Sequence, residues 1–211
     1  MGERAQRQAG LNVLSFDPRS HVYRWNNRRI PSVTQCLEPL FDWSSIPAAV
    51  LMHKRLVGIA VHKAIHLDLS GGVDPDSIHP DCRGYFEAWR AFRNECQFEP
   101  ILTEFQVTSD ELGEYYRYAG TLDEYGLLQG QPALIDWKTS MLLNVEAVGA
   151  QTAAYLKALK RMGLASLSDR RYALKLSKAG LYRLDAYRRL DDDWQRFVYQ
   201  RKHWQPERTH A

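Results

Sequence analysis

The sequence predicts an α/β fold in which a central mixed β-sheet is flanked by helices, and three observations support that prediction. Between residues 101 and 140, apolar and polar side chains alternate in successive runs separated by turn residues, which is typical of β-strands. Apolar residues recur at helical spacing before these runs, over 48–69, and after them, over 144–162. A chain of 211 residues with 45% hydrophobic and 25% charged residues can also bury a substantial core.

The N-terminal part is predicted to form a hairpin followed by a connection, over residues 11–47. The alternating residues 21–25 and the shorter run 28–30 are its two strands, because the asparagines at 26–27 tolerate the positive φ of a tight turn. Residues 1–10 are polar, and a chain end of this composition is expected to be flexible.

Two helices are predicted between this hairpin and the strands. The first, 48–69, ends at the Ser-Gly-Gly of 70–72 and should bury the apolar residues that recur at three- and four-residue steps: Val50, Leu51, Val57, Val61, Ile65 and Leu69. The second, 80–96, carries four aromatic residues: Tyr85, Phe86, Trp89 and Phe92.

The β-rich middle is predicted to hold three strands, at 101–110, 114–128 and 132–140. After the 144–162 helix, residues 170–190 are expected to form a second hairpin, and three aspartates then favour the start of a last helix. Internal repeats and low-complexity linkers are absent, so the chain is interpreted as a single domain, 1–211, with a core at 48–190 and a C-terminal helix at 191–211.

Charge and cysteine usage limit the class of protein. A net charge of +3 and a pI near 8.7 permit a nucleic-acid partner without requiring one. The three cysteines are too scattered for a zinc ribbon or a disulfide framework and are interpreted as reduced thiols: Cys36, Cys82 and Cys96. The start lacks the apolar run of a signal peptide, and no run could span a membrane, so a cytoplasmic location without a membrane partner is expected.

A charged pair near the end of an apolar strand is the first candidate for chemistry. Asp136 and Lys138 are two residues apart and therefore project to one side of a strand, while Trp137 projects to the other. Asp123, on the preceding strand, is near enough to meet Asp136 if the strands pair. Two neighbouring carboxylates repel unless a cation joins them, and oxygen ligands suit Mg²⁺ or Mn²⁺. From these residues alone, a surface Asp–Lys ion pair on an edge strand is the alternative.

Several short motifs resemble those of RecB-type nucleases, which belong to the PD-(D/E)xK superfamily. The GxxxH, GxxD, (D/E)xK and QxxxY motifs of that family are matched, in chain order, by residues 58–62, 120–123, 136–138 and 151–155. Residues 23–37, YRWNNRRIPSVTQCL, are similar to the opening of small phage RecB-like exonucleases. The resemblance runs from residue 21 to residue 190.

This resemblance implies a restriction-endonuclease-like (PD-(D/E)xK) core and a Mg²⁺- or Mn²⁺-dependent deoxyribonuclease, an exonuclease of phage or bacterial recombination or repair. Several relatives also hold an iron–sulfur cluster on four cysteines, three of them near the C-terminus. This chain has no cysteine after Cys96, so no iron–sulfur cluster is expected.

The resemblance also implies roles for particular residues. The metal ligands would be the side chains of His62, Asp123 and Asp136 together with the main-chain carbonyl of Trp137. The other catalytic residues would be the lysine that serves the attacking water and two residues on one helix face: Lys138, Gln151 and Tyr155.

The sequence leaves the roles of two further residues open. His66 lies four residues after His62, as in a zinc pair, but without the glutamate of HExxH. Glu104 is either a further acidic residue of the site or an exposed strand carboxylate.

DNA is the expected partner. Basic residues form short groups along the chain, and Tyr115, Tyr116 and Tyr118 precede Asp123, as in a groove that stacks bases and follows a phosphate backbone. The resemblance further suggests a single-strand annealing or recombination protein as partner, a homo-oligomer, and the host cytoplasm for a phage protein. Two alternatives stay open: a non-catalytic DNA-binding or assembly subunit with the same fold, and a restriction-type endonuclease.

Overall fold

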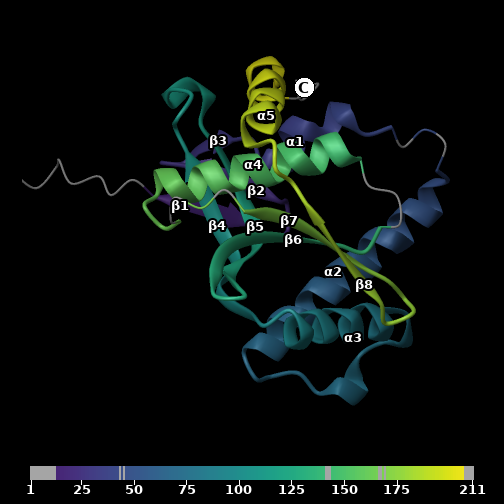
Figure 1. Ribbon diagram of the computed structural model, residues 1–211. Helices are drawn as coiled ribbons and strands as arrows, with labels where there is room; N and C mark the ends of the chain where they lie inside the picture. Colours follow the sequence, from purple (N-terminus) through teal and green to yellow (C-terminus); the bar gives the residue numbers. More distant parts are fainter. Residues whose placement is uncertain are drawn as a thin grey trace, which may run out of the picture.

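A five-stranded sheet forms the centre of the protein (Figure 1). Its strands are, in spatial order, β4 (Phe98–Ser109), β5 (Tyr118–Leu128), β6 (Gln131–Lys138), β7 (Arg171–Leu176) and β8 (Tyr182–Ala186). β6 and β7 are parallel, and the other neighbouring strands are antiparallel. The predicted α/β fold with a central mixed sheet flanked by helices is therefore confirmed.

The computed structural model describes residues 13–42, 44, 46–140, 144–165, 168 and 170–206. The N-terminal segment that is expected to be flexible, 1–10, and the last residues of the predicted C-terminal helix, 207–211, lie outside this description. Within it, no helix is long and apolar enough to cross a membrane.

Helices cover both faces of the sheet. On one face lie α1 (Val33–Leu37), α4 (Val145–Arg161) and α5 (Leu190–His203), and on the other lie α2 (Ala48–Leu69) and α3 (Pro80–Glu95), as Figure 1 shows. α4 provides the crossover that a parallel pair of strands requires. Among the described residues there are also three short 3-10 helices: η1 (Glu38–Leu40), η2 (Pro75–Ser77) and η3 (Glu114–Tyr116).

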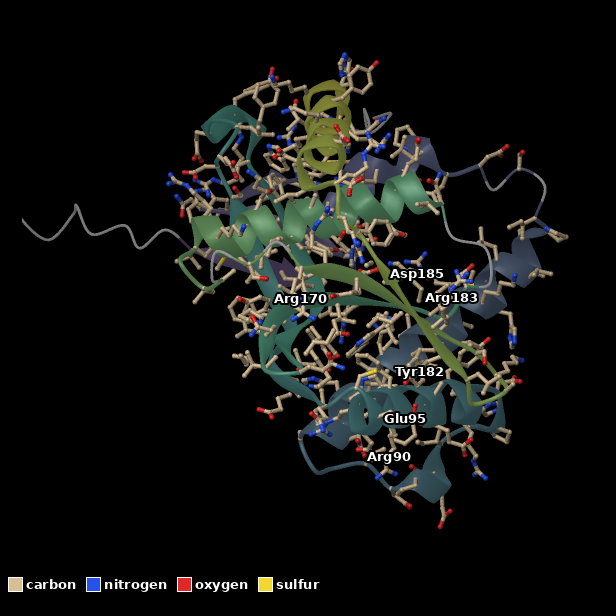
Figure 2. All side chains as sticks on the ribbon, in the orientation of Figure 1. Arg90, Glu95, Arg170, Tyr182, Arg183 and Asp185 are labelled. Atoms are coloured by element: carbon tan, nitrogen blue, oxygen red, sulfur yellow. The ribbon has the colours of Figure 1, made fainter. Side chains whose placement is uncertain are left out.

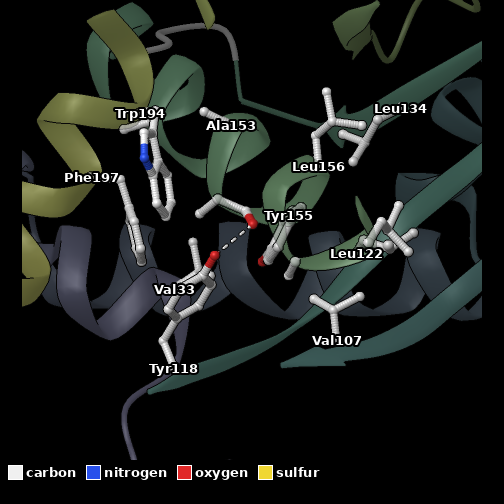
Figure 3. Packing of buried hydrophobic residues seen from close by; sticks show 14 of the residues in the cluster. Val33, Val107, Tyr118, Leu122, Leu134, Ala153, Tyr155, Leu156, Trp194 and Phe197 are labelled. Atoms are coloured by element: carbon white, nitrogen blue, oxygen red, sulfur yellow. Dashed lines mark hydrogen bonds between the residues drawn. The ribbon is translucent and has the colours of Figure 1, made fainter. Parts of the chain in front are cut away.

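Each face of the sheet carries its own hydrophobic core. Against α4 and α5, Tyr118 of β5 packs edge-on to Phe197, and its hydroxyl donates to the carbonyl of Ala154 at 3.0 Å, the dashed line in Figure 3. On the opposite face, Trp137 packs with α2 and α3, and the hydroxyl of Tyr182 on β8 donates to Glu95 on α3 at 2.7 Å (Figure 2). All three cysteines are free thiols.

A small three-stranded sheet precedes these elements: β1 (Leu14–Asp17), β2 (Val22–Trp25) and β3 (Arg28–Ile30). The predicted hairpin is confirmed, since Asn26 and Asn27 adopt φ values of 49° and 66°. β1 was not predicted, because four residues with a single alternation give little periodic signal. The sheet is joined to β5 by a 2.6 Å hydrogen bond between the hydroxyls of Tyr23 and Thr121.

Three local predictions are wrong. The C-terminal helix predicted over 191–211 ends at His203, because Pro206 disfavours a helical backbone at the residue before it and cannot donate a helix hydrogen bond. The strand predicted from residue 114 begins at Tyr118, because Arg201 of α5 donates to the carbonyls of Tyr115 and Arg117 and holds that backbone in a turn. Val50, predicted to be buried, is 43% exposed, because the first turns of α2 extend beyond the sheet (Figure 1).

Candidate functional site

β5 and β6 separate at one end, and the candidate site lies where they do so. Their last regular pair is Glu124 with Ile135. At the next residue of β5, the Asp123 carboxylate accepts a hydrogen bond from the main-chain N–H of Trp137. In a regular sheet, a main-chain carbonyl of β5 would accept that bond. The N–H and carbonyl of one strand residue point to the same side, so the Trp137 carbonyl is also directed into this opening.

Asp136 and Lys138 project together from β6, as their spacing predicts. The Lys138 ammonium lies 2.6 Å from Asp136 Oδ2, and the Asp136 side chain is almost fully buried. Trp137 projects to the opposite face and packs in the core beside α3. The alternative of an exposed ion pair on an edge strand is therefore wrong, because β6 is a central strand with neighbours on both sides.

His62 reaches the opening from α2. Its Nδ1 lies 3.1 Å from Glu104 Oε1 and 3.5 Å from Asp123 Oδ1, and its ring packs edge-on against Trp137. Ligand atoms of His62, Glu104 and Asp123 all lie within 4.8 Å of one another, so these three side chains could hold a metal ion. Asp136 is outside this group of three and is paired with Lys138 instead.

Glu104 belongs to the site, which resolves one of the two open questions. It lies opposite Asp123, between the partner pairs Thr103 with Glu124 and Phe105 with Leu122. Its φ is +48°, a left-handed conformation that is costly for a residue with a Cβ and uncommon inside a strand. The local distortion of β4 turns the carboxylate of Glu104 toward His62, and alternation of apolar residues could not have indicated it.

Gln151 and Tyr155 lie on the buried face of α4 and extend the network. Lys138 Nζ donates to Gln151 Oε1 at 3.1 Å, and Gln151 Nε2 donates to the Tyr155 hydroxyl at 3.3 Å. Gly120 allows this approach, since a Cβ at that position would lie 2.6 Å from the Tyr155 ring. The glycine of the GxxD pattern therefore has a packing reason.

One hollow of 260 Å³ gathers these groups. Its lining includes all seven of the residues that the resemblance implies, together with Glu104: His62, Asp123, Asp136, Trp137, Lys138, Gln151 and Tyr155. His66 is exposed and does not line this hollow; it shares a neighbouring hollow with His62 and Glu104. Among the described residues, it is not part of the close group of ligand atoms formed by His62, Glu104 and Asp123.

Burial and charge act against each other in the site. Burial raises the pKa of Asp123 to about 7, with His62 opposing the rise and Asp136 adding to it. The pKa of His62 is lowered by burial, but Asp123 and Glu104 outweigh that effect and raise it overall. The pKa of Lys138 is raised in the same way, because Asp136 and Asp123 outweigh its burial. These shifts reflect the crowding of several carboxylates in a partly buried hollow, and a cation bound there would relieve the repulsion between them.

Comparisons with known proteins give little further information. No protein-family model matches the chain, and no curated protein matches it. A crystal structure of the protein SSO0001 is similar over 81% of this chain and 85% of that one, at 13% identity and a TM-score of 0.34. A likeness at that TM-score carries no argument about fold or function.

Proposed function

We propose that this protein is a Mg²⁺- or Mn²⁺-dependent deoxyribonuclease of the PD-(D/E)xK type, with a restriction-endonuclease-like core. One observation carries the proposal: a single hollow brings together three strand carboxylates, a strand lysine and a helix histidine. Folding alone does not require this set, because burying charged groups costs free energy unless they are paired or bind an ion.

The donor atoms fit a divalent cation. The side chains of His62, Glu104 and Asp123 would hold it. Asp136 and Trp137 line the same hollow, and the Trp137 carbonyl is directed into it. Carboxylate and carbonyl oxygens with one imidazole, and without a thiolate, favour Mg²⁺ or Mn²⁺ among the common metals. When bound, such an ion polarises a phosphodiester and lowers the pKa of water.

The chain's own residues supply the remaining functions. The Lys138 ammonium, held between Asp136 and Gln151, is placed to orient the attacking water and to offset negative charge that develops on the phosphate. Tyr155 holds Gln151 in turn, so the α4 pair positions the lysine. The Asp123 carboxylate fixes the main chain at Trp137, and with it the direction of that carbonyl.

Hydrolysis of a phosphodiester follows from this chemistry, whereas DNA as substrate and exonuclease action rest on the motif resemblance. Linear duplex, single-stranded and closed circular DNA, each incubated with the protein and Mg²⁺, Mn²⁺ or EDTA, separate the alternatives. An exonuclease degrades linear DNA and leaves the closed circle intact. Cleavage of the circle indicates a restriction-type endonuclease instead, and DNA that is bound but never cut indicates the non-catalytic subunit.

Two substitutions test the assignment of the site. Asp123→Asn and Lys138→Met keep side-chain size and should each reduce cleavage by about 100-fold or more, as loss of a main electrostatic group does. Asp76→Asn and Lys54→Met are matched controls, because both residues are exposed and neither is among the residues that line the hollow. Cleavage that survives the first two substitutions at the level of the controls would overturn the proposal.

A further inference from the structure

A second hollow, with a different chemistry, lies beside the β2–β3 hairpin. It has a volume of 470 Å³ and lies between the hairpin, the turn before β5 and the end of α5. It adjoins a hollow of 370 Å³, since both are lined by Arg29, Trp204 and Gln205. We call it the aromatic–basic groove and define it by six of its residues: Trp25, Arg28, Arg29, Tyr115, Lys202 and Trp204.

The groove is strongly cationic. Four basic side chains line it, and its one carboxylate, Glu114, is engaged by a two-pronged ion pair with Arg117. Arg28, Arg29 and Lys202 are exposed and make no ion pair within the described residues. Exposed cations that are close together and unpaired repel one another, and an anionic ligand relieves that repulsion.

Of the aromatic rings in the groove, Tyr115 is exposed and Trp25 and Trp204 are half-buried, and neighbouring groups contact all three. Tyr115 is 74% exposed, although its backbone carbonyl accepts a hydrogen bond from the buried Arg201 guanidinium. The same guanidinium lies 5.7 Å from the centre of the Trp204 ring. The Arg117 guanidinium covers one face of Trp25 at 4.0 Å. The Tyr115 ring itself packs edge-on against Tyr116, with 4.9 Å between the ring centres. Because these contacts position the rings before a ligand arrives, little conformational entropy is lost when a base stacks on them.

We propose that the aromatic–basic groove binds single-stranded DNA. Its bases would stack on Tyr115 and Trp204, and its phosphates would pair with Arg28, Arg29 and Lys202. A duplex hides its base faces, so exposed rings favour a single strand. A second copy of this chain is disfavoured by charge, since each copy would present the same cations.

The groove also begins close to the candidate site. Tyr23 and Trp25 are two residues apart on β2, so their side chains project from the same face about 7 Å apart. Tyr23 lines the site hollow and Trp25 lines the groove. The two hollows are therefore neighbours along β2, and a single strand long enough to span them would reach both. This path rests on the proposed nuclease function, whereas the affinity of the groove for DNA does not.

The experiment measures binding of a fluorescent 20-nucleotide oligothymidine to the full chain by anisotropy, in EDTA so that cleavage plays no part. Tyr115→Ala and Trp204→Ala should each weaken binding about 5- to 150-fold, the range measured for loss of one stacked base. Trp204→Phe, which keeps a ring, should restore most of the affinity. Arg28→Glu with Arg29→Glu should weaken binding further and reduce the slope of log affinity against log salt by about 0.7 for each phosphate that the protein no longer neutralises.

Arg188→Glu with Arg189→Glu is the matched control, because it changes the net charge equally at adjacent exposed arginines outside the groove. Equal losses in the two double variants would overturn the proposal, as would poly-glutamate competing as well as oligothymidine. Dimerisation that Tyr115→Ala abolishes would also overturn it and assign the groove to self-association. If the protein binds DNA through the groove but never cuts it, the proposed function fails while this inference stands. If the protein cuts DNA and the groove variants bind oligothymidine normally, this inference fails while the proposed function stands.

Discussion

Asp123 and Glu124 are neighbours in the chain, but their carboxyl groups have different surroundings. Asp123 lines the site hollow, whereas Glu124 is fully buried on the opposite side of β5. Glu124 accepts a 2.9 Å hydrogen bond from the indole N–H of Trp137. Burial raises the pKa of Glu124 to about 8, against the opposing effect of that hydrogen bond. Glu124 is therefore mainly a neutral acid near pH 7, and it positions the ring that packs on His62.

Glu124→Gln should change how stability depends on pH. Between its ordinary pKa of 4.5 and about 8, the folded protein holds a proton on Glu124 that the unfolded chain has released. The free energy of unfolding therefore falls as pH rises through this window, by up to about 1.4 kcal/mol per pH unit. Glutamine keeps the acceptor and cannot ionise, so the variant and the natural protein should be similarly stable at pH 5, with the variant more stable at pH 8.5.

Urea unfolding in EDTA at several pH values measures this difference. Glu99→Gln, at an exposed position of β4, is the control and should leave the pH dependence unchanged. Parallel stability curves for Glu124→Gln and the natural protein would show that Glu124 is ionised in the folded state.

Glu104→Gln tests the residue that motifs did not assign. It replaces a charged carboxylate of the group with a neutral amide, which is a weaker ligand for a divalent cation. Mn²⁺ affinity should therefore fall by about tenfold or more, the smallest usual effect of losing even an indirect partner of a metal. The pKa of His62 should fall as well, because Glu104 contributes to raising it. Titration calorimetry and histidine NMR measure the two effects. Unchanged Mn²⁺ affinity would exclude Glu104 as a ligand.

At the scale of elements, the approach of β5 to α4 sets the geometry of the site. Gly120 faces the Tyr155 ring, and a Cβ there would also lie 3.4 Å from Val33 of α1. Tyr155 is buried and accepts a hydrogen bond from Gln151, which in turn accepts one from the Lys138 ammonium. The Tyr155 ring therefore cannot move aside without disturbing Gln151 and Lys138. Strand β5, the crossover helix α4 and the Lys138 side chain are thus coupled by packing.

Gly120→Ala should therefore cost about 1–3 kcal/mol of stability, as overpacking of a core does, and should lower activity together with it. The penalty should be smaller in a Tyr155→Ala background, because the ring that causes the clash is then absent. Chemical unfolding of the two single variants and the double variant measures this coupling. Gly72→Ala, where the nearest atom lies 3.8 Å from a Cβ, is the control. If the stability losses of Gly120→Ala and Tyr155→Ala simply add in the double variant, the Tyr155 ring is not the group that the new Cβ contacts.

At the scale of the whole molecule, a metal ion should stabilise the fold, because His62, Glu104 and Asp123 come from α2, β4 and β5 and meet only when it is formed. Mn²⁺ at 100 times its dissociation constant should raise the free energy of unfolding by about 2.7 kcal/mol. For a chain of this size, that corresponds to a Tm increase of about 5–10 °C.

Differential scanning calorimetry with Mn²⁺ or EDTA measures the increase. It should disappear in His62→Ala and persist in His66→Ala, since only His62 belongs to the group of three ligands. The same increase in both variants would show that the ion binds elsewhere.

Much of the fold was predictable because it depends on local patterns. The bounds of α2 were predicted to the residue, and β6, the two hairpins and the crossover helix to within a few residues, since apolar periodicity and turn residues act over short distances. The motifs also identified side chains that the structure brings into one hollow. β1, the turn before Tyr118 and the exposure of Val50 depend on distant elements, and local patterns carry no information about those.

By itself, the sequence determined most of the segments that form helices and strands and most of the side chains that can bind a cation, because propensity and functional groups are local properties. Only the tertiary structure decided that Glu104 joins His62, through a left-handed backbone that its residue type does not favour. It also decided that Asp123 replaces a strand carbonyl, and that residues 25, 28, 29, 115, 202 and 204 line one groove. These outcomes depend on contacts between residues far apart in the chain, whose free energy is set by the packing of the whole molecule.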